Sequence, residues 1–101
     1  MKILLFALLL AAGGTPVQAG EAGSFIQLGA ERTEAAAAQS WENVRNRTGT
    51  LLDSLEPRIS PVEVKHKGRF YRLRAGPVDV RDAASICAQL KARAIDCMVV
   101  H

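Results

Sequence analysis

Bulky and polar side chains alternate in two segments of the chain, residues 24–31 (SFIQLGAE) and residues 70–78 (FYRLRAGPV). Alternation with a period of two is typical of β-strands, in which successive side chains point to opposite faces of a sheet. Ile26 and Leu28 then share one face of the first strand, and the later strand has an apolar face that includes Leu73. We expect these apolar positions to pack against a core.

A helical pattern follows the first strand. Thr33 can cap a helix, and the alanine-rich run that follows it has high helix propensity. Ala37, Trp41 and Val44 are spaced by four and three residues, which places them in one apolar stripe. Gly49 is a natural helix end. The spacing therefore predicts a helix between Thr33 and Gly49, with Trp41 in the core.

A second helix is predicted after Asp79, which can cap its first turn. Two further strands are predicted, an edge strand over residues 59–65 and a final strand over residues 95–100. Pro61 suits an edge strand because it cannot donate a ladder hydrogen bond, and Lys67-Gly68 is a plausible hairpin turn. The stripe of the second helix that is expected to face the sheet consists of Ala83, Cys87, Leu90 and Ala94.

The elements follow in the order strand, helix, strand, strand, helix, strand. This order predicts an α+β fold of the split βαβ type, in which a four-stranded antiparallel sheet (βαββαβ) carries two helices on one face. The first and third strands lie side by side at the centre of such a sheet. The face opposite the helices is left open for binding.

The N-terminal segment predicts export. Lys2 precedes an apolar run over residues 3–12, a Gly-Gly break follows, and Ala19 precedes the expected cleavage point. Residues 1–19 have the organisation of a secretory signal peptide, and the apolar run is shorter than the roughly 20 residues needed to span a bilayer. We expect a short tail over residues 20–23, one small domain over residues 24–101, and no membrane anchor after cleavage.

Cys87 and Cys97 are the only cysteines of the chain. In an oxidising compartment, an even number of cysteines favours a disulfide over free thiols or a metal site. Their spacing differs from the C-x-x-C arrangement of redox-active pairs. If Cys97 points inward toward the second helix, its neighbour Met98 joins the open face. We therefore predict a structural disulfide and no metal or cofactor.

A polar patch is expected on the open face, with Phe25 and Gln27 on the first strand and Phe70, Arg72 and Arg74 on the third. The formal net charge of +3 falls to +2 with the loss of Lys2, so net charge alone says little about partners. No acidic residue lies between Glu63 and Asp79, however, whereas five basic residues do. The patch suits a polar ligand that carries ring faces and negative charge. The basic residues nearer the hairpin turn, Lys65, Lys67 and Arg69, are expected to form a solvated edge.

The two alternating segments and the helical segments that follow them, in this order, resemble the SPOR domain, the sporulation-related repeat of bacterial envelope proteins. The likeness covers residues 24–100, and its most specific parts are Gln27-Leu28-Gly29 and the run YRLRAGP over residues 71–77. The resemblance implies a non-catalytic domain that binds peptidoglycan and favours glycan strands stripped of stem peptides at the division septum. It also implies a periplasmic location and, as further partners, periplasmic division or cell-wall proteins.

The resemblance implies binding residues on the open face and in the loop after the first strand. Pyranose faces can lie on Phe25 or Phe70, acetamido groups can hydrogen-bond Gln27, and lactyl carboxylates suit arginine. Ala30 and Glu31 stand where many family members have a serine and an aromatic residue. The expected glycan-binding residues are Phe25, Gln27, Gly29, Ala30, Glu31, Phe70, Arg72, Arg74 and Met98.

Two other classes of function remain open from the residues. RNA-recognition modules use the same fold with aromatics on the first and third strands, but the signal peptide and the lack of an aromatic-glycine-aromatic pattern argue against nucleic acid. An adaptor that binds a periplasmic protein through the same face or the exposed edge strand is the leading alternative. An enzyme is not expected, because neither His66 nor His101 has a partner placed by local spacing.

Overall fold

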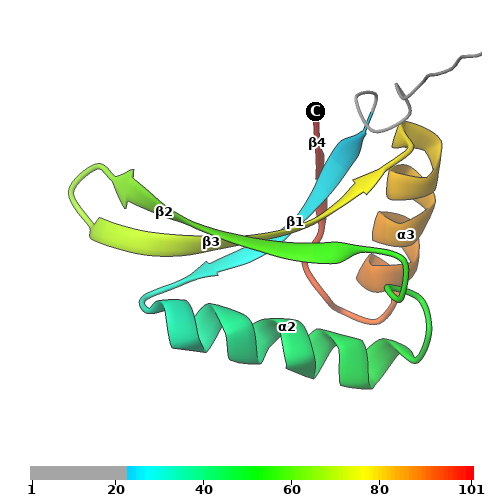
Figure 1. Ribbon diagram of the computed structural model, residues 1–101, viewed down its shortest axis with the longest axis horizontal. Helices are drawn as coiled ribbons and strands as arrows, with labels where there is room; N and C mark the ends of the chain where they lie inside the picture. The colour runs from blue at the N-terminus through cyan, green and yellow to red at the C-terminus, as the bar shows by residue number, and fades with distance from the viewer. Residues whose placement is uncertain (1–22) are drawn as a thin grey trace, which may run out of the picture.

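The computed structural model describes residues 23–101, and the predicted signal peptide over residues 1–19 lies outside them. The strands are antiparallel and lie in the order β2-β3-β1-β4. The predicted βαββαβ order and the central pairing of the first and third strands are confirmed (Figure 1). The elements are β1 (Ser24–Glu31), α2 (Glu34–Thr48), β2 (Glu56–Val64), β3 (Gly68–Val78), α3 (Val80–Ala92) and β4 (Met98–Val100).

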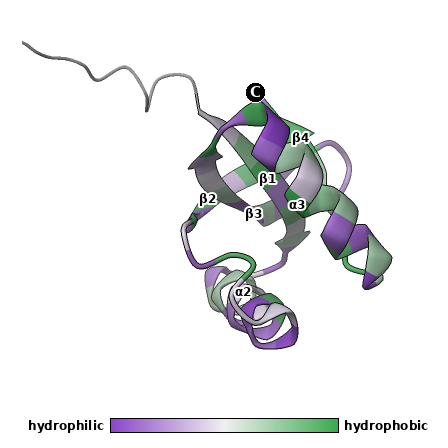
Figure 2. Ribbon diagram, turned by 90° about the vertical axis from the view of Figure 1, so that its right-hand side faces the viewer, coloured by the Kyte–Doolittle hydropathy of each residue, from purple (hydrophilic) through white to green (hydrophobic). Residues whose placement is uncertain are grey.

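Both helices cover the same face of the sheet. α2 packs against β1, β2 and β3, and α3 packs against β1 and β4. Figure 2 shows the sheet above α2, with mostly hydrophilic residues on the parts of α2 that are turned away from the strands. The opposite face of the sheet is not covered by either helix.

The core lies between the sheet and the helices. Ile26, Leu73 and Ala75 contribute from the two central strands, and the predicted burial of Trp41 on α2 is confirmed, with 6% of its surface exposed. Alternation along β1 and β3 is therefore the feature that separates the core face from the open face. The other buried residues of this cluster are Leu52, Leu55, Ala83, Cys87, Leu90, Ile95 and Cys97.

The two helices begin where the sequence predicts. The Thr33 hydroxyl accepts a hydrogen bond from the Ala36 N–H at 3.0 Å, and an Asp79 carboxylate oxygen accepts one from the Arg81 N–H at 2.8 Å. Each bond satisfies an N–H group that has no partner within the first turn. Neither helix described over residues 23–101 has the length and apolarity needed to cross a membrane.

The end of α3 differs from the prediction. Ala94 was expected in the inward stripe, but α3 ends at Ala92 and Ala94 is exposed with φ 61°. The Ala94 N–H bonds the Lys91 carbonyl at 2.9 Å and the Ile95 N–H bonds the Leu90 carbonyl at 3.0 Å, which is a Schellman ending. Alanine occupies the position that glycine usually holds in this motif, so the sequence does not mark the stop.

Four strand boundaries also differ, one of them the end of β2, which lies at Val64 and not at residue 65. β4 begins at Met98 and not at residue 95, because Ile95 belongs to the helix ending and Cys97 is bonded to Cys87 on α3. β2 begins at Glu56, three residues before the predicted start, and β3 begins at Gly68. The hairpin turn consists of residues 65–67, with a 2.8 Å hydrogen bond from the Lys67 N–H to the Val64 carbonyl, and not of Lys67-Gly68.

Candidate functional site

Strand register places four side chains in one row across the open face. Gln27 is the Cα partner of Arg74 on β3 and of Met98 on β4, and Arg74 is the partner of Arg58 on β2. Residues directly opposite each other share a face of the sheet. The central row, Arg58, Arg74, Gln27 and Met98, therefore crosses the four strands over about 14 Å, since neighbouring strands lie about 4.8 Å apart.

Arg74 and Gln27 are joined at the middle of the row. The Arg74 Nε–H donates a hydrogen bond to Gln27 Oε1 at 2.9 Å. This bond fixes the planes of both side chains and leaves the terminal guanidinium nitrogens of Arg74 and the Nε2 donors of Gln27 available to a ligand. The predicted placement of these two residues on one face is confirmed.

Phe25 lies beside the row and supports Arg58. A Cβ atom at Gly76 would come within 2.7 Å of Phe25 Cδ2, so the absence of a side chain at Gly76 gives the Phe25 ring the room to lie over β3. On that ring rests Arg58, whose Cζ is 4.6 Å from the ring centroid. This distance is in the range of a cation–π interaction. Phe25 therefore holds an arginine, in addition to any contact that it makes with a ligand.

Phe70 has a similar companion nearer the hairpin turn. The Cζ atom of Arg32 lies 4.2 Å from the Phe70 ring centroid, and Arg32 Nη1 donates to the Lys67 carbonyl oxygen at 2.8 Å. Both aromatic residues of the predicted patch are thus in contact with arginines. Neither Arg32 nor Arg58 was among the predicted site residues.

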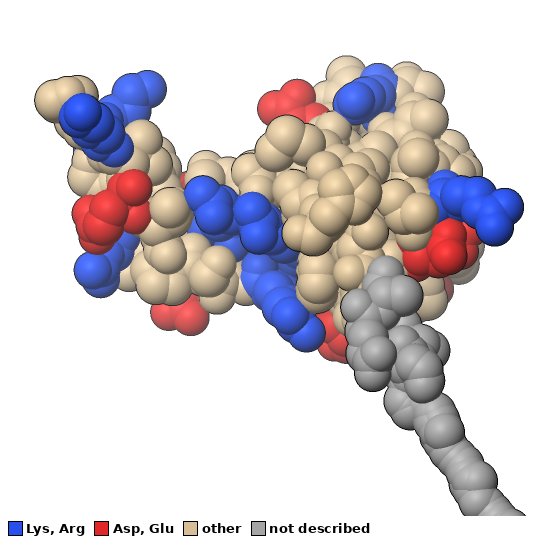
Figure 3. All heavy atoms as spheres, turned by 90° about the horizontal axis from the view of Figure 1, so that it is seen from above, with Lys and Arg blue, Asp and Glu red and all other residues tan. Residues whose placement is uncertain are grey.

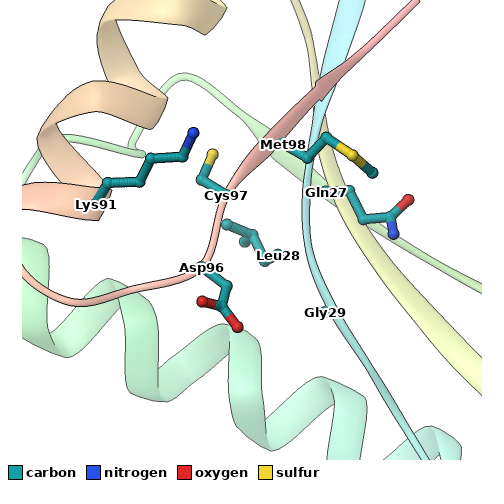
Figure 4. Close-up of a pocket in the computed structure, with 7 residues that line it drawn as sticks. All are labelled: Gln27, Leu28, Gly29, Lys91, Asp96, Cys97 and Met98. Carbon is teal, nitrogen blue, oxygen red and sulfur yellow. The ribbon is translucent and has the colours of Figure 1, made fainter.

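Two open grooves lie at the ends of the Arg74–Gln27 pair. The first, the Arg58 groove, has a volume of about 370 Å³ and is lined by Phe25, Arg58, Ile59, Ser60 and Arg74. The second, the Met98 groove, has a volume of about 500 Å³ (Figure 4). It is lined by Gln27, Leu28, Gly29, Lys91, Asp96, Cys97 and Met98.

The Met98 groove exists because β4 is short. β4 pairs only with residues 25–27 of β1, and the Cys87–Cys97 disulfide holds the preceding segment against α3. β1 therefore has no neighbouring strand on that side beyond Gln27. Figure 4 shows Gln27 and Met98 extending to one side of the sheet, whereas Lys91 approaches from α3 on the other.

Positive charge gathers over the middle of the open face. Figure 3 shows Lys and Arg side chains clustered there, and β2 and β3 contribute Arg58, Arg72 and Arg74. In residues 23–101, ion pairs form at Arg45 with Glu42 and at Arg69 with Glu63, but at none of these three arginines. The open face thus carries guanidinium groups whose charge is available for an anionic ligand.

Most predicted site residues come together on this face. Gln27, Arg74, Phe25 and Met98 lie on or beside the central row, Met98 being 53% exposed, and Arg72 lies opposite Ala30. Phe70 lies on the same face toward the hairpin turn, and Gly29 lines the Met98 groove.

Glu31 is not brought together with the others. Its carboxylate accepts a hydrogen bond from the Ser40 hydroxyl of α2 at 3.0 Å, and its Cα partner is Tyr71, so it lies on the face that the helices cover. Its negative charge is consequently directed away from the arginines. The β-bulge between Gln27 and Gly29 determines to which face of the sheet the following side chains of β1 point.

The predicted disulfide is present. Cys87 on α3 and Cys97 before β4 are bonded, with their Cα atoms 5.2 Å apart. Both residues are buried, with 4% and 7% of their surfaces exposed. The bond ties the second helix to the strand that supplies Met98, and so supports one end of the central row.

Comparison with known proteins agrees with this architecture. A family model described as SPOR domain matches residues 20–101. The chain is similar in structure to the crystal structure of the RlpA SPOR domain from Pseudomonas aeruginosa, with a TM-score of 0.58 and 21% sequence identity over 78% of this chain and 99% of that one. No curated protein shows significant sequence similarity to the chain.

Proposed function

Because the chain belongs to the SPOR domain family, whose members bind peptidoglycan without catalysing a reaction, we propose that it binds glycan strands stripped of their stem peptides at the division septum. The observation that carries the proposal is the hydrogen-bonded Arg74–Gln27 pair at the centre of an open, arginine-rich face, with a groove on either side. A strand of sugars that crosses the sheet along the central row would contact both grooves.

The chemistry of the face suits bare sugars. The Nε2 donors of Gln27 can bind the carbonyl of an acetamido group, and the terminal nitrogens of Arg74 can bind sugar oxygens or carboxylates. Stem peptides attached to the sugars would keep the glycan away from these side chains. Removal of the peptides therefore favours binding by letting the glycan approach the sheet.

The location follows from the N-terminal pattern. We propose that residues 1–19 are a signal peptide, that the mature domain is periplasmic, and that stripped strands at the septum concentrate it there.

A sedimentation assay with purified sacculi tests the ligand. Sacculi digested with an amidase should retain more protein than undigested sacculi, and the double variant Gln27→Ala plus Arg74→Ala should lose this enrichment. Arg45→Ala is the matched control, because Arg45 lies exposed on α2 and pairs with Glu42 at 3.4 Å. Equal retention on digested and undigested sacculi would contradict the proposed preference and favour the adaptor alternative.

Localisation tests the cellular role. The protein fused to a periplasm-competent fluorophore should form a midcell band, and the same double variant should weaken that band. A uniform peripheral signal from a folded fusion would argue against septal recruitment.

A further inference from the structure

Two arginines face each other directly across β2 and β3. Arg58 and Arg74 are Cα partners on the open face. Like charges in directly opposite positions destabilise a sheet. Within residues 23–101, no carboxylate forms an ion pair with either side chain. The folded protein thus keeps two arginines at directly opposite positions on one groove, without an ion pair to its own acidic residues.

Each of the two guanidinium groups is held by a different neighbour. Arg58 rests on the Phe25 ring at 4.6 Å, and Arg74 donates its Nε–H to Gln27. Orienting an arginine before binding reduces the side-chain entropy lost when the ligand arrives. The two held arginines line the Arg58 groove together with Ser60, whose hydroxyl can donate or accept a hydrogen bond.

We propose that Arg58 and Arg74 form an anion subsite that takes the carboxylate of a stripped sugar, and that Phe25 is a positioning residue for Arg58. The inference rests on the proposed function and deepens it. In an intact strand the lactyl carboxylate is consumed in the amide bond to the stem peptide, and amidase cleavage restores its negative charge. The preference for stripped strands then has two causes: the steric hindrance of the stem peptide is removed, and the restored carboxylate is attracted to the arginines.

Titration calorimetry with soluble glycans tests the subsite. The wild-type protein should bind amidase-stripped strands about tenfold more tightly than the same strands with their carboxylates converted to methyl amides, the ratio expected for a lost charge-assisted hydrogen bond. Chitin oligosaccharides, which lack the lactyl group, should bind as weakly as the methyl amides. Arg58→Gln should lower affinity for the stripped strands by a similar factor and leave the affinity for methyl-amidated strands unchanged.

The control variant is Arg45→Gln, which removes the same charge from the exposed surface of α2 and should bind like the wild type. Binding of stripped and methyl-amidated strands with equal affinity would overturn the subsite while leaving the proposed function intact. Failure of the wild-type protein to bind any glycan strand would overturn both. Arg58 is exposed at the edge of the sheet, so its substitution is not expected to prevent folding, which circular dichroism can check.

A double-mutant cycle tests the role of Phe25. If Phe25 acts through Arg58, Phe25→Leu should weaken binding of stripped strands in the wild-type background and have almost no further effect when Arg58 is already glutamine. If Phe25 stacks on the sugar by itself, the two losses should add. Additive losses would overturn the positioning role.

Discussion

The hairpin formed by β2 and β3 carries two charged cross-strand pairs, one made of opposite charges and the other of like charges. Near the turn, Glu63 lies opposite Arg69, and the Arg69 Nε–H donates to the Glu63 carboxylate at 2.9 Å. Toward the other end of the hairpin, Arg58 lies opposite Arg74, and no ion pair forms. In the first pair the two opposite charges compensate each other. In the second pair, compensation of the two positive charges requires an anion from outside the protein.

The position of each pair in the fold agrees with this difference. Figure 1 shows that the turn end of the hairpin extends beyond α2, where the Glu63–Arg69 pair and the contacts of Arg32 with Phe70 and the Lys67 carbonyl stabilise it. The Arg58–Arg74 pair belongs to the part of the sheet that joins β1, whose core face is buried against the helices. Stability there comes from the core, so the open face can tolerate the unfavourable charge arrangement that the proposed anion subsite requires.

Reversing the charge of Arg58 should have the largest effect on binding. Arg58→Glu makes the pair resemble Glu63–Arg69, so the carboxylate can pair with Arg74 and repel an anionic ligand. We expect affinity for stripped strands to fall about a hundredfold, which corresponds to about 3 kcal/mol. The free energy of unfolding should stay constant or rise by up to about 0.5 kcal/mol.

Calorimetric titration and urea denaturation of the same sample measure the two quantities. A large loss of stability in Arg58→Glu would mean that Arg58 is needed for folding. The distinction between a stabilising pair and a binding pair would then not hold.

Removing the disulfide should lower stability without acting on either arginine pair. In the chain-entropy model, a closed loop with a sequence separation of 10 is worth about 2–3 kcal/mol, so Cys87→Ser plus Cys97→Ser should lose this much in urea denaturation. The loss should be accompanied by a smaller loss of affinity, through β4 and the Met98 end of the central row. An unchanged unfolding midpoint would show that the packing of Cys87 and Cys97 suffices without the bond.

Replacing Arg74 by lysine should separate charge from geometry. Lysine keeps the positive charge but loses the planar fork and the Nε–H donor to Gln27. We expect affinity for stripped strands to fall about tenfold, or about 1.4 kcal/mol, at low and moderate salt alike. Arg69→Lys is the matched change near the turn and should leave affinity unaltered. Equal affinity of Arg74→Lys and the wild type would indicate that a diffuse positive field is sufficient.

The architecture could be predicted from the sequence because strand alternation, helical spacing and helix caps all indicate the same fold. Alternation marks β1 and β3, helical spacing places Trp41 in the core, and Thr33 and Asp79 cap the helices as expected. The end of α3 could not be predicted, because Ala94 adopts a positive φ that is usually reserved for glycine. That stop in turn shortens β4 and opens the Met98 groove.

The candidate site was only partly predictable for similar reasons. Gln27 and Arg74 were identified from alternation alone, and strand register joins them. Arg58 was missed because the edge strand was expected to begin at residue 59, which left Arg58 outside the sheet. Glu31 was included because the family resemblance implied binding residues directly after Gln27-Leu28-Gly29. The β-bulge that turns Glu31 toward the helices is not visible in the sequence pattern.

Neutralising Glu63 should have the smallest effect. Glu63→Gln removes the partner that raises the pKa of Arg69 by hydrogen bonding, and it should lower the unfolding midpoint slightly because both side chains are exposed. The difference from the wild type should shrink as salt is added, since salt screens exposed charges. Affinity for stripped strands should not fall, because the pair near the turn lies outside both grooves. Weaker binding by folded Glu63→Gln would mean that the ligand reaches the hairpin turn, and the separation of a structural pair from a binding pair would have to be abandoned.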